Sequence, residues 1–379
     1  MRTLIFFSNV TLGYGSPKYI YFMEKAYSLK IFKEIISYEP YEKQRPFFEL
    51  RKNFKRSIIG QGLANLTGKL GLSKSYRFER HIKKSIQSFL HSFVIIKSAL
   101  LSYCRPLFIV TTFESPLFGL FSKNTIFLQN FSEIWEEIDN VSTKPSRCSS
   151  FLLNRYYVNA SYLVAPQEDR LAIAATRYVN SKGYLIHNVP RYTDFEKPVL
   201  TTDKKRILYQ GRVSDDSLGS KILELAESLP EDVEFHLAGL VNKNYVEQVE
   251  DLIEKGKLTY HGYLDWKSLD ALRKTCNIGL VSWSDNTLNT KYCAPNKLYE
   301  YISSGMYVIC FDNYSLKKLN QQFDFGFICG IPKEIAEHVK EICFEKMLCK
   351  GEENYQLFKK ELNYENQTKQ LFLDIYQDN

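Results

Sequence analysis

The chain contains 379 residues, of which 44% are hydrophobic and 25% are charged, and its formal net charge is +7. This composition is globular and excludes collagen-like, low-complexity and largely disordered chains, while the length predicts two or three domains. None of the eight cysteines forms a Cys-x-x-Cys pair, and no run of 18 uncharged apolar residues occurs, so we expect reduced thiols in the cytoplasm and no membrane-spanning helix.

The first half of the chain alternates predicted strands and helices, beginning with a strand at 4–7. A loop that contains Gly13 and Gly15 joins this strand to a helix that begins near Tyr19. The elements that follow are a strand at 31–37, a mostly helical segment at 41–102, strands at 106–112 and 125–128, a helix at 151–161, a strand at 162–165, a helix at 168–178 and a strand at 184–186. The polar, proline-containing stretch 191–205 is the predicted linker between domains.

The excess positive charge lies in one segment of the first half. Residues 41–100 contain 13 basic and three acidic residues, a net charge of +10, which leaves −3 for the remainder of the chain. Aromatic side chains are interleaved with these charges, as in segments that dock on anionic lipid headgroups, where each basic residue contributes about 1 kcal/mol. The alternatives are a solvated helical face and nucleic-acid binding. No helix-turn-helix, zinc-finger or RNP pattern supports the last, so we expect an anionic membrane surface and no nucleic acid.

The second half repeats the alternation more regularly. Strands are expected at 206–211, 233–238, 258–263, 278–282 and 307–311, and helices at 221–229, 246–253, 266–276, 296–304 and 351–378. Gly256 and Asp265 are expected to cap helices. Such alternation gives parallel sheets with both faces covered. The predicted fold is α/β, with two doubly wound domains at 1–190 and 206–350 that face a cleft, and a C-terminal helix at 351–379 that packs back on the first domain.

The most informative window is 294–305. Pro295 suits the first turn of a helix, where its missing N–H is not needed, and the spacing of Lys297, Glu300 and Tyr301 places them on one face. The helix N-terminus and the Lys297 ammonium would stabilise a diphosphate, and one turn later Glu300 could accept hydrogen bonds from a ribose diol. Phosphate beside a diol is the shape of a nucleotide. The alternative is a surface Lys–Glu pair, which contributes only a few tenths of a kcal/mol.

The sequence resembles the donor-binding signature of GT-B glycosyltransferases of the family 4 type, the glycosyl transferases group 1, in the run Pro295-Asn296-Lys297-Leu298-Tyr299-Glu300-Tyr301-Ile302-Ser303-Ser304-Gly305 and the hydrophobic strand after it. The strand that ends at Gly211-Arg212 is similar to the opening of the family's donor domain. The resemblance extends over residues 184–312 and implies two Rossmann-like domains.

The resemblance implies a role for each matching residue. Glu300 would hold the nucleotide ribose, and Arg212 would contact the donor diphosphate, to which a guanidinium is suited. The implied donor-binding set is Gly13, Gly15, Gly211, Arg212, Asn296, Lys297, Leu298 and Glu300, and the implied catalytic set is Glu133, Arg212 and Lys297. Glu133 lies in a stretch similar to the acceptor-side loop, where it would act as a base or an acceptor ligand. The alternative for Glu133 is an acidic residue that stabilises a helix N-terminus.

Three positions depart from the family pattern. Tyr292 stands where the first glutamate of the family's pair is expected, eight residues before Glu300. The stretch 214–218 lacks the lysine that follows Gly-Arg in the family, and Lys221 comes late. Tyr307 stands in place of the usual proline. These departures bear on the donor and on the stereochemical outcome.

The resemblance implies a retaining hexosyltransferase that moves a sugar from a nucleotide-diphosphate donor to a glycan or lipid-linked glycan in bacterial surface polysaccharide synthesis (O-antigen, capsule or lipopolysaccharide). No Asp-x-Asp pair or metal-ligand spacing occurs, which favours transfer without a metal or cofactor. The enzyme would be cytoplasmic and peripheral on the inner face of the cytoplasmic membrane.

The alternatives are a catalytically degenerate protein that binds a nucleotide sugar or a partner, and a nucleotide-sugar epimerase. His187, His236 and His261 lie in or beside strand patterns and are expected to be structural.

Overall fold

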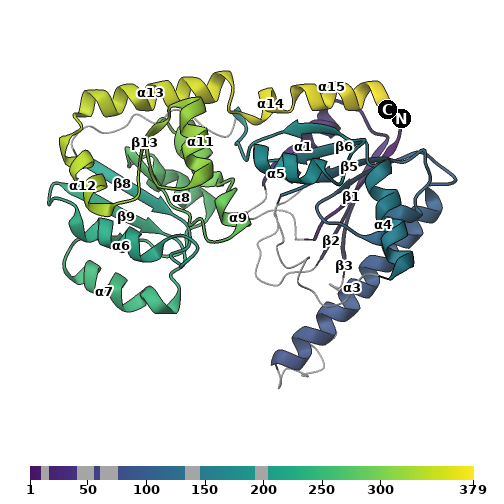
Figure 1. Ribbon diagram of the computed structural model, residues 1–379, viewed down its shortest axis with the longest axis horizontal. Coiled ribbons are helices and arrows are strands. Elements are labelled where there is room, and N and C mark those ends of the chain that lie inside the picture. The colour runs from purple at the N-terminus through teal and green to yellow at the C-terminus, as the bar shows by residue number, and fades with distance from the viewer. Residues whose placement is uncertain (10–16, 41–54, 60–75, 133–145, 193–203) are drawn as a thin grey trace. The chain divides into compact units, whose positions relative to one another are not determined.

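The computed structural model describes residues 1–9, 17–40, 55–59, 76–132, 146–192 and 204–379 (Figure 1). Two compact units make up the chain. The first is built from residues up to Ile186 together with Thr368–Asn379, and the second from His187–Gln367. Three residues of the predicted site lie outside the described residues: Gly13, Gly15 and Glu133. Most of the basic segment 41–100 also lies outside them or has side chains that are not described.

The first unit is built on a parallel sheet whose described strands follow the order β3-β2-β1-β4-β5-β6-β7 (Figure 1). These strands are β1 (Thr3–Phe7), β2 (Glu34–Pro40), β3 (Lys55–Ile59), β4 (Leu107–Thr111), β5 (Ile126–Asn130), β6 (Tyr162–Ala165) and β7 (Lys182–Leu185). Its helices are α1 (Pro17–Ser28), α3 (Tyr76–Leu101), the 3₁₀ helix η1 (Pro116–Leu120), α4 (Arg147–Asn159), α5 (Glu168–Ala175) and α15 (Lys369–Asp378). Strands β1 and β4 are apolar along nearly their whole length and buried at every residue, as parallel strands covered on both faces must be.

The second unit contains a parallel sheet of described strands in the order β10-β9-β8-β11-β12-β13. These are β8 (Lys205–Gln210), β9 (Val233–Ala238), β10 (Thr259–Tyr260), β11 (Ile278–Val281), β12 (Tyr307–Phe311) and β13 (Gly326–Cys329). The helical elements are α6 (Gly219–Ser228), η4 (Lys243–Tyr245), α7 (Val246–Glu254), α8 (Trp266–Arg273), α9 (Leu288–Lys291), α10 (Asn296–Ser303), α11 (Tyr314–Phe323), α12 (Pro332–Glu341), α13 (Phe344–Lys360) and α14 (Tyr364–Gln367).

Both sheets confirm the predicted α/β fold with two doubly wound parallel sheets. In each sheet the strand order reverses direction beside the first strand of the unit, between β1 and β4 and between β8 and β11. In open parallel sheets, ligands bind outside the carboxyl ends of the strands at such a switch point. The ends of β8 and β11 are therefore the place in the second unit where a ligand site is expected.

The predicted helix caps of the second unit are confirmed. The Asp265 side chain accepts a hydrogen bond from the Ser268 N–H at 2.8 Å and begins α8. Gly256 follows α7 with a φ of +68°, which a glycine adopts without strain. Pro295 differs from its prediction, because it is the N-cap of α10 and lies just before the first turn.

Three other elements differ from their predicted extents. The expected strand at 31–37 begins three residues later, at Glu34, because the chain leaves α1 through Lys30 in a left-handed turn with a φ of +53°. The segment 41–102, expected to be mostly helical, contains β3 in addition to α3. The expected strand at 258–263 is reduced to the two residues of β10, because Gly262 turns the chain away with a φ of +66°.

The segment expected as one C-terminal helix over 351–379 is divided into three. The division occurs at Asn363, whose side-chain amide donates hydrogen bonds to the carbonyls of Phe358 at 2.8 Å and Lys359 at 3.0 Å. The Asn363 side-chain oxygen also accepts the backbone N–H of Asn366 at 2.9 Å. One asparagine therefore ends α13 and begins α14.

Helix α15 belongs to the first unit, although α13 and α14 belong to the second. The Phe372 ring packs on Phe22 of α1 at a centroid distance of 5.1 Å. The Asp374 carboxylate accepts hydrogen bonds from Lys182 and Tyr184 of β7. The last helix is thus fixed to the first unit by apolar packing on one side and by a charged contact on the other. Among the described helices, none is long and apolar enough to cross a membrane.

Candidate functional site

Helix α10 presents an uncapped N-terminus beside the end of β8. Its N-cap is Pro295, which has no side chain able to accept a hydrogen bond from the first turn, and no described side chain takes that role. The free N–H groups of a helix start carry a partial positive charge and favour an anion. Asn296 begins this turn and is partly exposed, whereas the Leu298 side chain is 1% exposed. The buried Leu298 side chain is therefore closed to a ligand, and the Leu298 backbone N–H donates to the carbonyl of Pro295 at 3.3 Å.

Lys297 lies over Gly211, the residue that follows β8. The ammonium Nζ is 4.3 Å from the centroid of the Tyr209 ring and 5.8 Å from that of Trp283, which follows β11. A Cβ at Gly211 would be 2.8 Å from Nζ, and Gly211 also has a φ of +140°. Only glycine fits this position without displacing the lysine. The group that approaches Gly211 most closely is the Lys297 ammonium.

Arg212 adds a second cation next to Gly211. Its side chain is exposed, while its backbone carbonyl accepts hydrogen bonds from the Tyr209 hydroxyl at 2.8 Å and the Ser217 hydroxyl at 2.7 Å. The backbone is fixed and the guanidinium is left to the solvent. Lys221 does not contribute to this group, because its ammonium donates to the carbonyl of Gly330 at 2.8 Å.

Glu300 lies one turn along α10 from Lys297 and contacts two residues that the sequence analysis did not single out. Its Oε2 accepts a hydrogen bond from the Gln210 side-chain amide, and the same oxygen is 3.9 Å from Nη2 of Arg273. Arg273 ends α8 and is fully buried. Gln210 could have been noticed because it precedes Gly211 directly, but no sequence signal distinguishes Arg273 from a surface arginine at a helix C-terminus.

Tyr292 occupies an aromatic environment where the family pattern expects a carboxylate. Its ring packs edge-on against Tyr314 at 5.6 Å, and the Lys291 ammonium lies 5.7 Å and 5.3 Å from the two ring centroids. The preceding loop is fixed by Asn313, whose side chain donates to the carbonyls of Ser284 at 3.2 Å and Thr290 at 3.1 Å. The loop that follows β11 is therefore rigid without a glutamate at this position.

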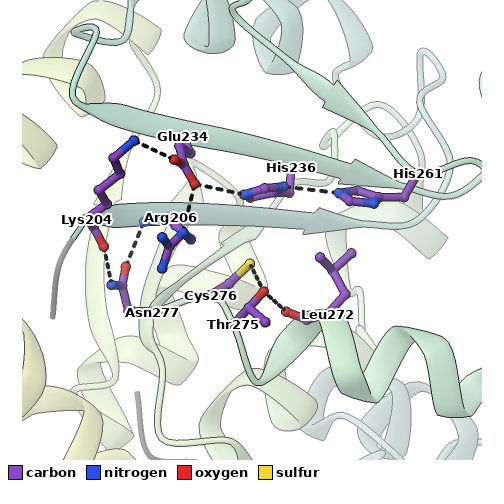
Figure 2. Close-up of polar contacts among 9 residues, drawn as sticks. All are labelled: Lys204, Arg206, Glu234, His236, His261, Leu272, Thr275, Cys276 and Asn277. Carbon is purple, nitrogen blue, oxygen red and sulfur yellow. Dashed lines mark hydrogen bonds and ion pairs between the residues drawn. The ribbon is translucent and has the colours of Figure 1, made fainter. Parts of the chain in front are cut away.

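His236 of β9 and His261, which follows β10, form a separate polar cluster (Figure 2). His236 Nδ1 lies 3.1 Å from His261 Nε2, which requires one ring to donate a proton and the other to accept it. Burial lowers the pKa of both imidazoles. The Glu234 carboxylate is 3.6 Å from His236 and is held by Arg206 at 2.8 Å and Lys204 at 2.9 Å, and these hydrogen bonds lower its pKa to about 2.

This cluster links β8, β9 and the residue that follows β10 through side chains, and its members are partners of one another. The third histidine, His187, stacks on the Tyr299 ring at 5.4 Å. These contacts are of the structural kind that was expected for all three histidines. The candidate site of the second unit is therefore placed at the residues around Gly211, at the switch point of its sheet.

Comparison with known proteins gives one family match and a set of similar structures. Residues 190–355 match the family model described as glycosyl transferases group 1. HepE from Anabaena, solved with UDP-glucose, is 10% identical with a TM-score of 0.65, and both chains are covered over 100% of their length. WaaG, a glycosyltransferase involved in lipopolysaccharide biosynthesis, is 10% identical with a TM-score of 0.62 over 98% of this chain and 99% of that one.

A variant of TarM from S. aureus, solved with UDP, Fondaparinux and alpha-GlcNAc-glycerol, is 10% identical with a TM-score of 0.66 over 99% of this chain and 100% of that one. No curated protein matches the chain. The similarity to these structures extends over both units, whereas the family match covers the unit that contains the candidate site.

Proposed function

From the GT-B fold of the chain and the glycosyl transferases group 1 domain in its second unit, we propose that the protein transfers a hexosyl group from a nucleotide-diphosphate sugar. The observation that carries this proposal is the arrangement around Gly211. A lysine, an arginine and a helix N-terminus surround the end of β8, and a partly exposed carboxylate lies one helical turn away. That spacing suits a diphosphate beside a ribose.

The leaving diphosphate would be stabilised without a metal ion. The exposed Arg212 guanidinium presents several hydrogen-bond donors to phosphate oxygens. The Lys297 ammonium lies over the rings of Tyr209 and Trp283, which carry no charge and so leave its positive charge in place. Fixed positive groups placed where negative charge develops can supply several kcal/mol of transition-state stabilisation. Glu133 is kept as the proposed base or acceptor ligand, and Gly13 and Gly15 as proposed donor-phosphate contacts. The retaining outcome is part of the same proposal and rests on the family resemblance.

A thermal-shift panel with UDP, GDP, CMP, dTDP and their sugars, each with and without EDTA, tests the donor proposal. A ligand at 100 times its dissociation constant stabilises the folded state by about 2.7 kcal/mol, so the expected result is a higher Tm with one nucleotide, unchanged by EDTA. A shift that disappears in EDTA would contradict the metal-independent mechanism. No shift with any nucleotide would contradict the donor site itself.

The Tyr292 environment favours one rival function, a degenerate protein that binds a nucleotide sugar without turnover. Product analysis decides between the two. The assay uses the nucleotide sugar that binds. Release of the free sugar, or its transfer to an acceptor, would exclude a catalytically degenerate protein. Interconversion of the donor into an epimeric nucleotide sugar would instead indicate an epimerase.

The proposed acceptor is a lipid-linked glycan of bacterial surface polysaccharide synthesis, met at the inner face of the cytoplasmic membrane. Support comes from α3, whose exposed apolar residues recur at spacings of four and three and so form one stripe along the helix. The stripe consists of Phe89 (70% exposed), Phe93 (60%), Ile96 (39%) and Leu100 (68%), and continues into Tyr103 (63%) after the helix. Lys97 and Arg105 beside it are exposed, and the first half of α3 is rich in basic residues.

An anionic bilayer explains this stripe better than a second copy of the chain. Two copies of a basic helix packed together would repel one another, whereas basic residues around an apolar stripe complement an anionic lipid surface. We therefore take the stripe as the proposed contact with the membrane, and the acceptor as a molecule presented there.

A vesicle sedimentation assay tests the membrane contact. We expect the protein to bind vesicles that contain phosphatidylglycerol at low salt, and to bind pure phosphatidylcholine vesicles far less. The Phe93→Ser/Leu100→Ser variant should lose most of this binding because two of the apolar side chains of the stripe no longer enter the interface. Ile253→Ser, which changes an exposed apolar residue of the second unit, is the matched control. Equal binding by both variants, or no binding at low salt, would contradict the docking proposal.

A further inference from the structure

The geometry points to Gln210 and Arg273 as positioning residues for Glu300. They hold one carboxylate oxygen from inside the domain, so that the other oxygen alone meets the nucleotide ribose. This inference rests on the proposed donor site and adds two residues to it. It assigns one oxygen of the Glu300 carboxylate to contacts inside the domain and the other to the ribose.

The two oxygens of Glu300 have different surroundings. Oε2 receives the hydrogen bond from Gln210 and lies 3.9 Å from the Arg273 guanidinium. Oε1 has no partner within the described part of the chain. Gln210 is 7% exposed and Arg273 is fully buried, whereas the Glu300 side chain is 21% exposed. One oxygen therefore points to the interior and the other is open to a ligand, where both of its lone pairs can accept from ribose hydroxyls.

The interior side of this arrangement is fixed by hydrogen bonds between β8 and α10. The Gln210 backbone N–H donates to the Tyr301 hydroxyl at 3.0 Å, and that hydroxyl donates to the carbonyl of Leu208 at 3.0 Å. The Tyr301 ring fits because β11 has a glycine beside it: a Cβ at Gly279 would be 2.3 Å from the ring. The strand that carries Gln210 and the helix that carries Glu300 are thus joined independently of the Gln210 side chain.

The buried guanidinium supplies the charge that draws the carboxylate inward. Arg273 lies between two carboxylates, with Nη1 at 3.7 Å from Asp270 and Nη2 at 3.9 Å from Glu300. A buried cation of this kind requires compensating acids. Glu300 is therefore held towards the interior on Oε2 even before a nucleotide binds, and it does not have to reorganise when one does.

The stability of the fold does not explain why a glutamine occupies position 210. Its Oε1 is buried and has no donor within the described residues. A buried acceptor without a donor is unfavourable, so an apolar side chain of similar length would be tolerated or preferred by the fold. What only a side-chain amide provides here is the hydrogen bond to Oε2 of Glu300.

The experiment compares each nucleotide with its 2′,3′-dideoxy analogue, which lacks the hydroxyls that Glu300 would bind. Titration calorimetry is carried out with UDP and 2′,3′-dideoxy-UDP, and with GDP and 2′,3′-dideoxy-GDP. We expect the wild-type protein to prefer the ribonucleotide by about tenfold or more, the value for a charge-assisted hydrogen bond. Gln210→Met should reduce this preference to about threefold or less while its Tm stays equal to or above that of the wild type.

Two further variants separate positioning from general structural support. Tyr301→Phe removes the hydrogen bonds that join β8 to α10 and should lower the Tm while the preference for the ribonucleotide remains. The Asp270→Asn/Arg273→Met variant removes the buried cation together with its other acid, and should reduce the preference as Gln210→Met does.

Three outcomes of these titrations would contradict the inference. An unchanged preference in Gln210→Met overturns the positioning role, although the donor site would stand. An equal loss of preference in Tyr301→Phe also overturns it, because the effect would then be general. A wild-type protein that binds neither nucleotide overturns the proposed donor site and this inference with it.

Discussion

Replacing Glu300 with alanine is expected to weaken nucleotide-diphosphate binding by about 1.5–3 kcal/mol, the contribution of hydrogen bonds to a charged group. The physical reason is the loss of the open Oε1, which would accept from the ribose. Lys297 and Arg212 remain in place, so the diphosphate contacts are retained and binding is reduced without being abolished. Titration calorimetry on the nucleotide that gives the largest thermal shift measures the effect.

The alanine variant also removes an acid from a buried arginine, and a matched control must account for this. Asp270→Asn weakens the other ion pair of Arg273, at 3.7 Å, without touching the ribose side of Glu300. Both variants should lose stability, but only Glu300→Ala should lose ribose recognition. If the two variants bind the nucleotide with the same affinity as the wild-type protein, Glu300 is not a ligand and the site assignment is wrong.

The doubly wound fold was predictable because its signal is local and repeated. Apolar runs such as Tyr307–Phe311 alternate with helices of regular period, and a parallel sheet is the arrangement that such a pattern permits. The charged segment around β3 was not predictable as a strand. Its apolar pattern is short, and its pairing with β2 is a long-range interaction that the local residues do not reveal.

The candidate site was predictable where a residue type implies its chemistry. Lys297 and Glu300 were found because their spacing puts a cation and an acid on one helix face. Arg273 was not, because a fully buried arginine at the end of a helix reads in sequence as an ordinary exposed one. Gln210 was missed for a related reason: its side chain matters through its contact with Glu300, 90 residues away in the sequence.

Gly239→Ala is expected to be strongly destabilising and should lower the free energy of unfolding by about 3–5 kcal/mol through overpacking and backbone strain. A Cβ at this position would be 1.8 Å from the backbone oxygen of Gly211, and Gly239 also has a φ of +145°. The Gly211 backbone is itself held by a 2.8 Å hydrogen bond to Ala238, so neither strand end can move freely.

Gly256→Ala is the matched control for that substitution. Gly256 has a φ of +68°, but no atom of the described residues lies within 4 Å of the Cβ that alanine would add, so only the backbone strain of about 1–2 kcal/mol is expected. Urea unfolding of the two variants measures the difference. Gly239→Ala should also weaken nucleotide binding, because displacing Gly211 moves the backbone beneath the Lys297 ammonium, whereas Gly256→Ala should bind as the wild-type protein does. Equal stability and equal binding in the two variants would show that the close approach of Gly239 to Gly211 does not support the site.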